Sequence, residues 1–298
     1  MKTLPIIEQH FHGAFGVDFN KAGVNDIVRL AGMLHDIGIA GFFPTLVTDS
    51  VENIKRQISV IKDASRKCKG ILGIHLEGMF LNPAKKGIHN EKYFLPLTVD
   101  NYKNIEDDFI KIVTLAPELD EGLTSYLKRK SVKVQAGHCT GWTEGDNKPD
   151  GVTHMYNAMA GITHKECSTA LSALIDDSVY TEIIADGIHV NDDALRLLFK
   201  TKPKDKIILI SDALPLAHSN LRETVFADSK IYYDGKDARS ESGTLAGSTR
   251  LLPDIIKILG KKGLFRPEYI ENTYRYHDIK PIGELIWDED FNPLKISM

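Results

Sequence analysis

The sequence predicts an α/β fold, specifically a closed (β/α)8 barrel in which parallel strands alternate with helices. Short, nearly continuous apolar segments alternate with amphipathic ones, as expected for a parallel sheet covered by helices. The alternative is a doubly wound open sheet, but no Gly-x-Gly-x-x-Gly motif follows the first strand. The eight predicted strands span 6–10, 37–47, 70–77, 109–115, 132–138, 151–155, 180–185 and 206–212.

The segments between the strands have the apolar spacing of helices. We expect Asp49 or Ser50 to be the N-cap of the second helix. We also expect a single metal-dependent hydrolase domain over 1–298, with a barrel core from about 4 to 265 and a C-terminal tail over 266–298. The predicted helices span 25–36, 49–67, 165–176 and 192–200, with a further helix from after Glu118 to about Lys130.

The bulk composition is that of a globular protein, with 42% hydrophobic and 26% charged residues. A formal net charge of −4 gives no reason to expect a nucleic-acid partner. No apolar run approaches the ~20 residues that cross a bilayer, so no membrane partner is expected. The three cysteines have no C-x-x-C spacing, which predicts reduced thiols in a cytoplasmic protein.

Metal-binding and acid–base residues stand at the ends of several predicted strands. His10 and His12 are two residues apart and therefore share one face of the first strand. In a barrel of this kind the active site lies at the C-terminal ends of the strands. Imidazoles and carboxylates suit Zn²⁺, Fe²⁺, Mn²⁺ or a similar divalent ion. The sequence therefore predicts a site for one or two metal ions, and the further residues at strand ends are Glu77, His138, His154 and Asp212.

This set of residues predicts a hydrolytic reaction. A metal ion with three protein ligands keeps a position for water and lowers the pKa of that water from ~15.7 toward ~7. A nearby carboxylate can take the proton of the water and later protonate a leaving group. Asp212 is the candidate for that role. Such a site hydrolyses amides and related carbonyl compounds.

The motifs resemble those of the N-acetylglucosamine-6-phosphate deacetylases of the amidohydrolase superfamily. They occur in the family's order over roughly residues 4–252. They are His-Phe-His-Gly at 10–13, Gly-Val-Asp-Phe at 16–19, His-Leu-Glu-Gly-Met-Phe-Leu-Asn-Pro at 75–83, Lys-Lys-Gly-Ile-His at 85–89, Thr-Leu-Ala-Pro-Glu at 114–118, Thr-His-Met-Tyr-Asn-Ala-Met at 153–159, Ala-Asp-Gly-Ile-His-Val at 185–190, Ser-Asp-Ala at 211–213 and Gly-Thr-Leu-Ala-Gly-Ser at 243–248.

The resemblance implies a role for each matching residue. Glu77, His138 and His154 match metal ligands, and His10 and His12 match a pair that binds a second metal in some members. Asp212 matches the catalytic acid and base, and His89 matches a residue that contacts the substrate near its acetamide carbonyl. The other implied substrate contacts are Ile88, Asn157, Ala158, His189, Leu245, Ala246 and Gly247.

Three features depart from the family pattern. Lys165 stands where the family has an arginine that binds the sugar phosphate, in some members from the neighbouring subunit. Lysine keeps the charge but lacks the bidentate fork of arginine. Met79 replaces a proline, which we expect to loosen the turn after Glu77. The family's small β-sandwich domain is expected to be absent or vestigial.

The leading hypothesis is metal-dependent deacetylation of an N-acetyl amino-sugar phosphate, most simply N-acetylglucosamine 6-phosphate, by a cytoplasmic homodimer. One alternative is the same chemistry on an unphosphorylated sugar or an N-acyl amino acid, suggested by Lys165. The other is a non-catalytic sugar-phosphate sensor. We expect His75 to support the site rather than bind metal, and His35 and His277 to be structural.

Overall fold

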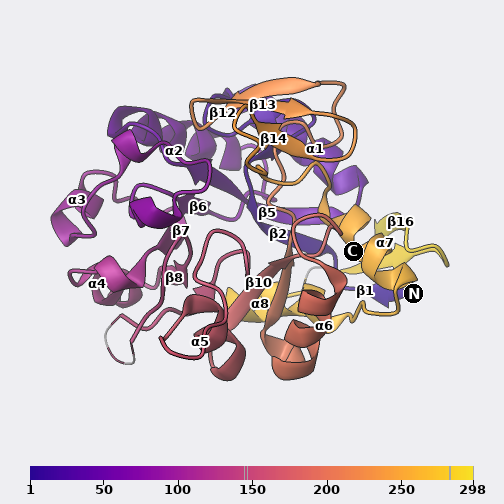
Figure 1. Ribbon diagram of the computed structural model, residues 1–298. Coiled ribbons are helices and arrows are strands. Elements are labelled where there is room, and N and C mark those ends of the chain that lie inside the picture. Colours follow the sequence, from indigo (N-terminus) through magenta and orange to yellow (C-terminus); the bar gives the residue numbers. More distant parts are fainter. Residues whose placement is uncertain (144, 146, 282, 298) are drawn as a thin grey trace.

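Eight parallel strands form a nearly closed ring, which confirms the predicted (β/α)8 barrel (Figure 1). The computed structural model describes residues 1–143, 145, 147–281 and 283–297. Hydrogen bonds from the His12 amide to the Ala213 carbonyl, 2.8 Å, and from the Asp212 amide to the His10 carbonyl, 2.9 Å, join the first and last strands. In ring order the strands are β2 (Ile6–Phe11), β5 (Ile39–Val47), β6 (Ile74–Glu77), β7 (Ile110–Leu115), β8 (Lys133–Ala136), β9 (Gly151–Val152), β10 (Tyr180–Ile184) and β11 (Ile207–Ile210).

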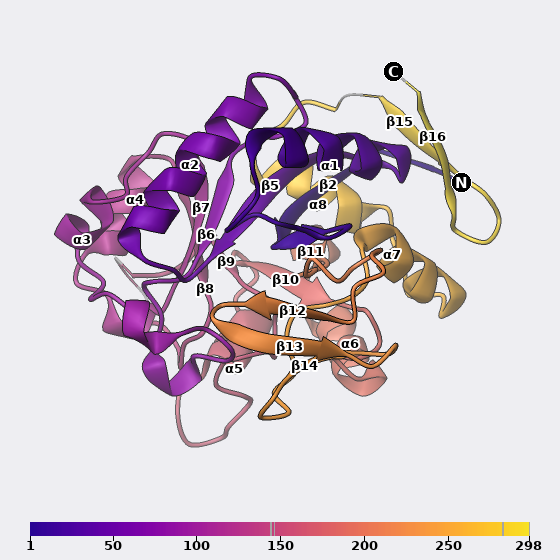
Figure 2. The same ribbon diagram turned by 90° about the horizontal axis from the view of Figure 1, so that it is seen from above.

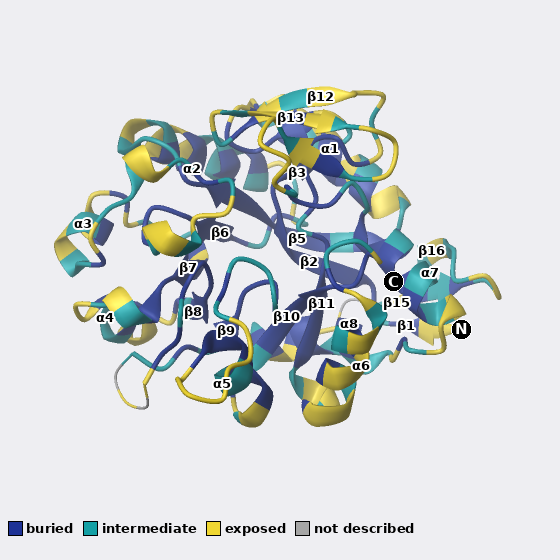
Figure 3. Ribbon diagram, in the orientation of Figure 1, coloured by how far each residue is buried: buried dark blue, intermediate teal, exposed yellow. Residues whose placement is uncertain are grey.

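Helices surround the ring, and their outward faces are exposed while the strands are buried (Figure 3). Ser50 is the N-cap of α2, because its hydroxyl accepts a hydrogen bond from the Asn53 amide at 3.2 Å. This confirms one of the two predicted caps. The helices are α1 (Val24–Asp36), α2 (Val51–Ser65), α3 (Val99–Lys103), α4 (Leu123–Arg129), α5 (Thr169–Ile175), α6 (Asp192–Thr201), α7 (Leu252–Lys261) and α8 (Glu268–Tyr276). Short 3-10 turns span Pro83–Lys85, Glu91–Tyr93, Pro117–Leu119 and Lys204–Lys206.

Two predicted helices are shorter than expected. The helix predicted from after Glu118 to about Lys130 begins only at Leu123, because a 3-10 turn comes first and Gly122 before α4 has a left-handed backbone with φ +96°. The helix predicted over 165–176 begins only at Thr169. Residues 161–167 are exposed, so no apolar face holds them in a helix against the barrel.

Three small antiparallel sheets accompany the barrel. One sheet follows β11 and precedes α7 in the chain and forms a separate flap, made of β12 (Glu223–Phe226), β13 (Ser229–Tyr233) and β14 (Ala238–Ser240) (Figure 2). β3 (Gly13–Ala14) pairs with β4 (Val17–Asp18). Both ends of the chain meet in the third sheet, whose strands are β1 (Lys2–Thr3), β15 (Glu284–Trp287) and β16 (Pro293–Ser297).

The segment 266–298, expected to be a tail, contains α8, which packs against β2 and β11. Among the residues that the structure describes, no helix has the length and apolar composition needed to cross a membrane.

Asn272 of α8 attaches this helix to the base of the last barrel strand. Its side-chain amide is fully buried and donates to the carbonyls of Lys204, 2.8 Å, and Ile207, 2.7 Å. We expect Asn272→Leu to lower the free energy of unfolding by about 1–3 kcal/mol, because these carbonyls lose their donor. Urea unfolding measures the change. Glu271→Gln, which removes the charge of the partly exposed ion pair between Glu271 and Arg275 on the same helix, is the control and should change stability by less than about 0.5 kcal/mol. Equal effects of the two substitutions would contradict this assignment.

Candidate metal centre and active site

Three strands end at residues with unusual backbone conformations. His138, His154 and Asp212 have φ values of +50°, +32° and +51°. Residues with a side chain rarely adopt this left-handed region, so the chain must leave the strand there. This explains why β8, β9 and β11 end before the predicted residues 138, 155 and 212. These strained backbone conformations occur where the side chains of the three residues converge.

The Glu77 carboxylate lies at the centre of the convergence. Its Oε1 is 2.9 Å from His154 Nε2 and 3.3 Å from His138 Nε2. Its Oε2 is 2.9 Å from His12 Nε2 and 3.2 Å from His10 Nε2. The four imidazoles therefore form two pairs, one on each oxygen of a single carboxylate.

Asp212 and His89 complete the group from the pocket side. Asp212 Oδ1 is 3.3 Å from His12 Nε2 and 3.5 Å from His10 Nε2. His89 Nε2 lies 3.9 Å from Glu77 Oε2. The His89 ring also meets the His138 ring edge to face, with centroids 4.4 Å apart. All the predicted metal and acid–base residues thus come together.

The residues present fit a divalent metal ion. The Nε2 atoms of His138 and His154 lie 3.2 Å apart, although at most one of them can donate a proton to the other. His10 Nε2 is buried and has no hydrogen-bond partner among the described residues. Nitrogen and oxygen atoms that converge without satisfying one another form the donor set that such ions bind. One ion would take Glu77 Oε1 with the pair His138 and His154, and a second would take Glu77 Oε2 with His10, His12 and Asp212.

Electrostatics inside this group are strong. Burial raises the pKa of Glu77, but the neighbouring histidines outweigh it and hold the pKa well below its usual range. Burial lowers the pKa of His12, yet Asp212 and Glu77 raise it overall to about 9. Without an ion, protons therefore occupy His12 and also His10, because Glu77 and Glu182 outweigh the burial that lowers the His10 pKa and raise it well above its usual value. Because a metal ligand must be unprotonated, metal uptake releases protons and strengthens as the pH rises.

A cavity of about 230 Å³ opens onto these residues. Lys165 is exposed and does not line it, and His10 lies buried beneath it. Phe226 and Thr244 also line the cavity and were not predicted, because only the folding of the flap brings them over the barrel. The cavity contains every other residue predicted to contact the substrate, namely Ile88, His89, Asn157, Ala158, His189, Leu245, Ala246 and Gly247.

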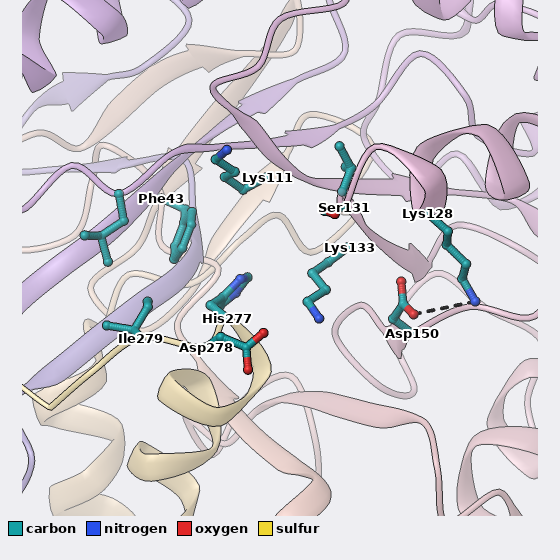
Figure 4. A pocket seen from close by; sticks show the side chains of 11 residues that line it. Phe43, Lys111, Lys128, Ser131, Lys133, Asp150, His277, Asp278 and Ile279 are labelled. Carbon is teal, nitrogen blue, oxygen red and sulfur yellow. Dashed lines mark ion pairs between the residues drawn. The ribbon is translucent and has the colours of Figure 1, made fainter.

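A larger hollow of about 610 Å³ lies at the opposite end of the barrel (Figure 4). Its lining comes from the N-terminal ends of the strands and includes Lys111, Lys133 and His277. None of the predicted catalytic, metal or substrate residues lines it. The smaller cavity is therefore the candidate active site.

The turn after Glu77 is held firmly, which corrects the expectation that Met79 loosens it. Met79 is buried, has φ +69°, and donates its amide to Thr48 Oγ1 at 3.1 Å. Proline could adopt neither that φ nor that hydrogen bond. A Cβ on Gly78 would lie only 2.2 Å from Thr48 Oγ1, so this position also requires glycine. Thr48 further pairs with His89 Nδ1 at 2.7 Å and thereby fixes the orientation of His89.

His189 brings positive charge to the pocket. Its Nδ1 lies 2.8 Å from Asp186 Oδ2 and its Nε2 lies 2.7 Å from the Ala246 carbonyl oxygen. Since both partners can only accept, both ring nitrogens carry protons in this geometry. Burial lowers the pKa of His189, but the Asp186 carboxylate outweighs it and raises the pKa overall. His189 is thus a cation whose charge is paired with that of Asp186 and whose second N–H holds the Ala246 carbonyl.

Several supporting residues were missed by sequence reasoning. Asp186 lies within the Ala-Asp-Gly-Ile-His-Val motif at 185–190, but its role depends on its pairing with His189. Glu8 and Glu182 are fully buried carboxylates within apolar strands. An acidic residue in an otherwise apolar strand is rare enough to have signalled them. His75 supports the site as expected, since its Nε2 pairs with Thr114 Oγ1 at 2.8 Å.

The Asp186–His189 pair predicts a pH-dependent effect. In metal-free protein, Asp186→Asn should lower the His189 pKa, because burial remains and the carboxylate charge is lost. His189 stabilises the fold fully below pH 6.5 and loses this contribution as the pH rises through its raised pKa. Asp186, with its pKa lowered from 3.8 to about 2, loses its contribution as the pH falls through that range. NMR titration of His189 measures the change. Ser248→Ala removes a hydrogen bond to Asp186 but keeps its charge, and should leave the His189 pKa raised. An unchanged His189 pKa in Asp186→Asn would contradict the pairing.

The chain is similar to proteins of known activity. No family model matches it. N-acetylglucosamine-6-phosphate deacetylase of Bacillus subtilis is 32% identical over 265 residues, covering 82% of this chain and 65% of that protein. N-acetylgalactosamine-6-phosphate deacetylase of Escherichia coli O157:H7 is 30% identical over 259 residues, covering 82% of this chain and 68% of that protein. The chain therefore spans about two thirds of the length of these relatives.

A solved structure shares the fold over almost the whole chain. N-acetylglucosamine-6-phosphate deacetylase from Thermotoga maritima matches with a TM-score of 0.90 and 26% identity, covering 98% of this chain and 86% of that chain. These findings confirm the resemblance recognised in the sequence. By its sequence identity to these relatives and its shared barrel, the chain belongs to the family of N-acetylglucosamine- and N-acetylgalactosamine-6-phosphate deacetylases, within the amidohydrolase superfamily.

Proposed function

We propose that the protein hydrolyses the acetamide of an N-acetyl amino-sugar phosphate, with N-acetylglucosamine 6-phosphate as the preferred substrate and glucosamine 6-phosphate and acetate as products. The observation that carries this proposal is the placement of Glu77, His138, His154 and Asp212 together at the base of one small pocket. The names of the relatives support the substrate class.

The residues divide the reaction among them. A divalent ion held by Glu77, His138 and His154 would supply an acidified water and polarise the acetamide carbonyl. The Asp212 carboxylate takes a proton from the attacking water and passes it to the departing nitrogen. Attack of water breaks the C–N bond, so one amide and one water give one amine and one carboxylic acid.

His89 is placed to stabilise the oxygen of the attacked carbonyl. Burial lowers the pKa of His89 well below its usual range, with His138 adding to the effect, so His89 is neutral. Thr48 Oγ1 accepts from the Met79 amide, which leaves its own proton for His89 Nδ1. The remaining ring proton is then on His89 Nε2, which faces the pocket residue Glu77 at 3.9 Å. A neutral donor at this place stabilises a developing oxyanion.

The pocket suits a small anionic sugar. Its volume of about 230 Å³ lies below the ~300–1,000 Å³ typical of ligand pockets, which supports a monosaccharide substrate. The cationic His189, together with Asn157 and Ala158, lines the cavity where the resemblance implies contacts to the sugar phosphate.

The exposed position of Lys165 favours a second candidate, an unphosphorylated N-acetyl sugar or an N-acyl amino acid. Acetate release should be compared on N-acetylglucosamine with and without the 6-phosphate, and on N-acetylgalactosamine 6-phosphate. We expect the highest kcat/KM with N-acetylglucosamine 6-phosphate. A preference for the sugar without phosphate would favour the second candidate, and no release from any of the three would overturn the proposal.

We further propose that the enzyme is a cytoplasmic homodimer. The three cysteines, Cys68, Cys139 and Cys167, are all unpaired, which suits a reducing compartment. In some family members the phosphate-binding cation comes from the neighbouring subunit, and Lys165 lies on an exposed segment able to serve that way. Sedimentation analysis tests the dimer.

Lys165→Met tests the role of this lysine. If Lys165 contacts the phosphate across the dimer, the substitution should raise KM for the phosphorylated sugar roughly 10-fold, about the value of one charge-assisted hydrogen bond. KM for the unphosphorylated sugar should stay the same. Lys200→Met, on another exposed segment, is the control. An equal change in both substrates would contradict a phosphate contact.

Asp212→Asn tests the proton-transfer step. We expect kcat to fall roughly 10²–10⁴-fold, because asparagine cannot accept the proton of water. Metal content should stay near that of the wild type, because asparagine keeps an oxygen at the same place. Elemental analysis and an acetate assay measure the two quantities. Asp193→Asn on the exposed surface of α6 serves as the control. Full activity of Asp212→Asn would rule out its proposed role.

A further inference from the structure

A layer of buried polar side chains lies inside the barrel, directly beneath the candidate metal centre. The interior of a barrel of this type is ordinarily filled by branched apolar residues. Here each of seven strands or strand ends contributes a polar residue that is at most 1% exposed. These residues are Gln9, Thr45, His75, Thr114, Gln135, Thr153 and Glu182.

Glu182 on β10 is the only carboxylate among these seven residues. Its Oε1 accepts hydrogen bonds from Gln9 Nε2, 2.6 Å, and Gln135 Nε2, 3.0 Å. Its Oε2 lies 3.0 Å from His10 Nδ1. Three side chains from two other strands, β2 and β8, therefore converge on one buried charge, and each must present a donor to it.

Both ends of this arrangement are held by further hydrogen bonds. Gln135 Oε1 accepts from the Thr153 hydroxyl at 3.2 Å. Gln9 Oε1 accepts from His277 Nε2 at 3.0 Å. His277 reaches the hollow at the opposite end of the barrel, where it stacks on Phe43 (Figure 4). The amide orientations of both glutamines are thus determined by partners on both sides, and Glu182 cannot turn away from His10 without breaking these bonds.

The proton on His10 follows from this arrangement. A carboxylate can only accept, so His10 must carry its proton on Nδ1. In the neutral ring, Nε2 is then unprotonated, and this is the buried atom without a hydrogen-bond partner that lies 3.2 Å from Glu77 Oε2 and 3.5 Å from Asp212 Oδ1. The opposite tautomer would place a nitrogen lone pair against Glu182 and a proton where an ion would bind.

We propose that Glu182 is a positioning residue, which fixes the Nδ1–H tautomer and the ring orientation of His10 and thereby completes the half of the metal centre formed by His10, His12 and Asp212. A carboxylate that accepts from the far nitrogen of a ligating imidazole raises the basicity of that ligand and orients its ring. The inference rests on the proposed function through the metal centre alone, and its readout is metal uptake, which needs no substrate.

Glu8 provides a matched control two residues before His10. It too is a fully buried carboxylate, but its oxygens accept from the backbone amides of His10, 3.2 Å, and Ser211, 3.1 Å. It therefore touches the same strand without touching the imidazole. Glu8→Gln and Glu182→Gln both replace a buried carboxyl group by an amide of the same size, and they differ in whether the changed side chain contacts the ligand ring.

The test is titration of the metal-free protein with Zn²⁺ by calorimetry in the presence of a competing chelator. We expect two uptake steps in the wild type. Glu182→Gln should weaken one of them roughly 10–100-fold and leave the other unchanged. Glu8→Gln should leave both affinities unchanged even where it lowers the thermal stability of the protein.

Three results would overturn the proposal. The first is a Glu182→Gln variant that binds Zn²⁺ with the affinities of the wild type. The second is an equal loss of Zn²⁺ affinity in Glu182→Gln and Glu8→Gln. The third is a wild type that binds only one ion, with the same affinity as Glu182→Gln. Should Glu182→Gln fail to fold, Gln9→Met removes the 2.6 Å bond that holds Glu182 and should weaken the same step by a smaller factor. An unchanged step in Gln9→Met would then count against the proposal. An acetate-release assay of the wild type separately shows whether the proposed function itself fails.

Discussion

The structure depends on a single buried carboxylate, that of Glu77. It is 2% exposed, and an ionised carboxylate in such a place is stable only with partners on each oxygen. Here the partners are four imidazoles, two on each oxygen. They come from three strand ends, those of β2, β8 and β9, so the barrel must close for the group to form. The site is thus a property of the closed ring rather than of any one segment.

Bringing these groups together requires energetically unfavourable features in the backbone and in the core. His138, His154 and Asp212 hold left-handed conformations, and a buried polar layer replaces apolar packing under the site. Neither feature stabilises a barrel by itself. Both orient side chains. The left-handed residues turn the chain at the ends of the strands, and the buried polar layer holds His10 Nδ1 and the side-chain amides of Gln9 and Gln135 in place. The apolar part of the barrel interior therefore stabilises the fold, while the buried polar layer positions the residues of the site.

The sequence was sufficient for the order of strands and helices and for most of the site, because the apolar periodicity and the strand-end residues are local signals. It was insufficient for the ends of the elements. The strand predicted over 151–155 ends at Val152, since the geometry of His154 depends on neighbours that only the fold supplies. For the same reason Phe226 was missed, and sequence alone could not show that Lys165 lies outside the pocket of its own chain. Glu182 carried a local signal, but its partner His10 is 172 residues away.

The central claim is that Glu77 joins two pairs of histidines into one metal centre. Crystals grown with Zn²⁺ test it most directly, through anomalous scattering recorded on both sides of the zinc absorption edge. We predict a peak about 2.0–2.2 Å from Glu77 Oε1, His138 Nε2 and His154 Nε2, with a second peak beside Glu77 Oε2, His10 and His12. Zinc bound only at other places on the protein, with no peak next to Glu77, would contradict the account.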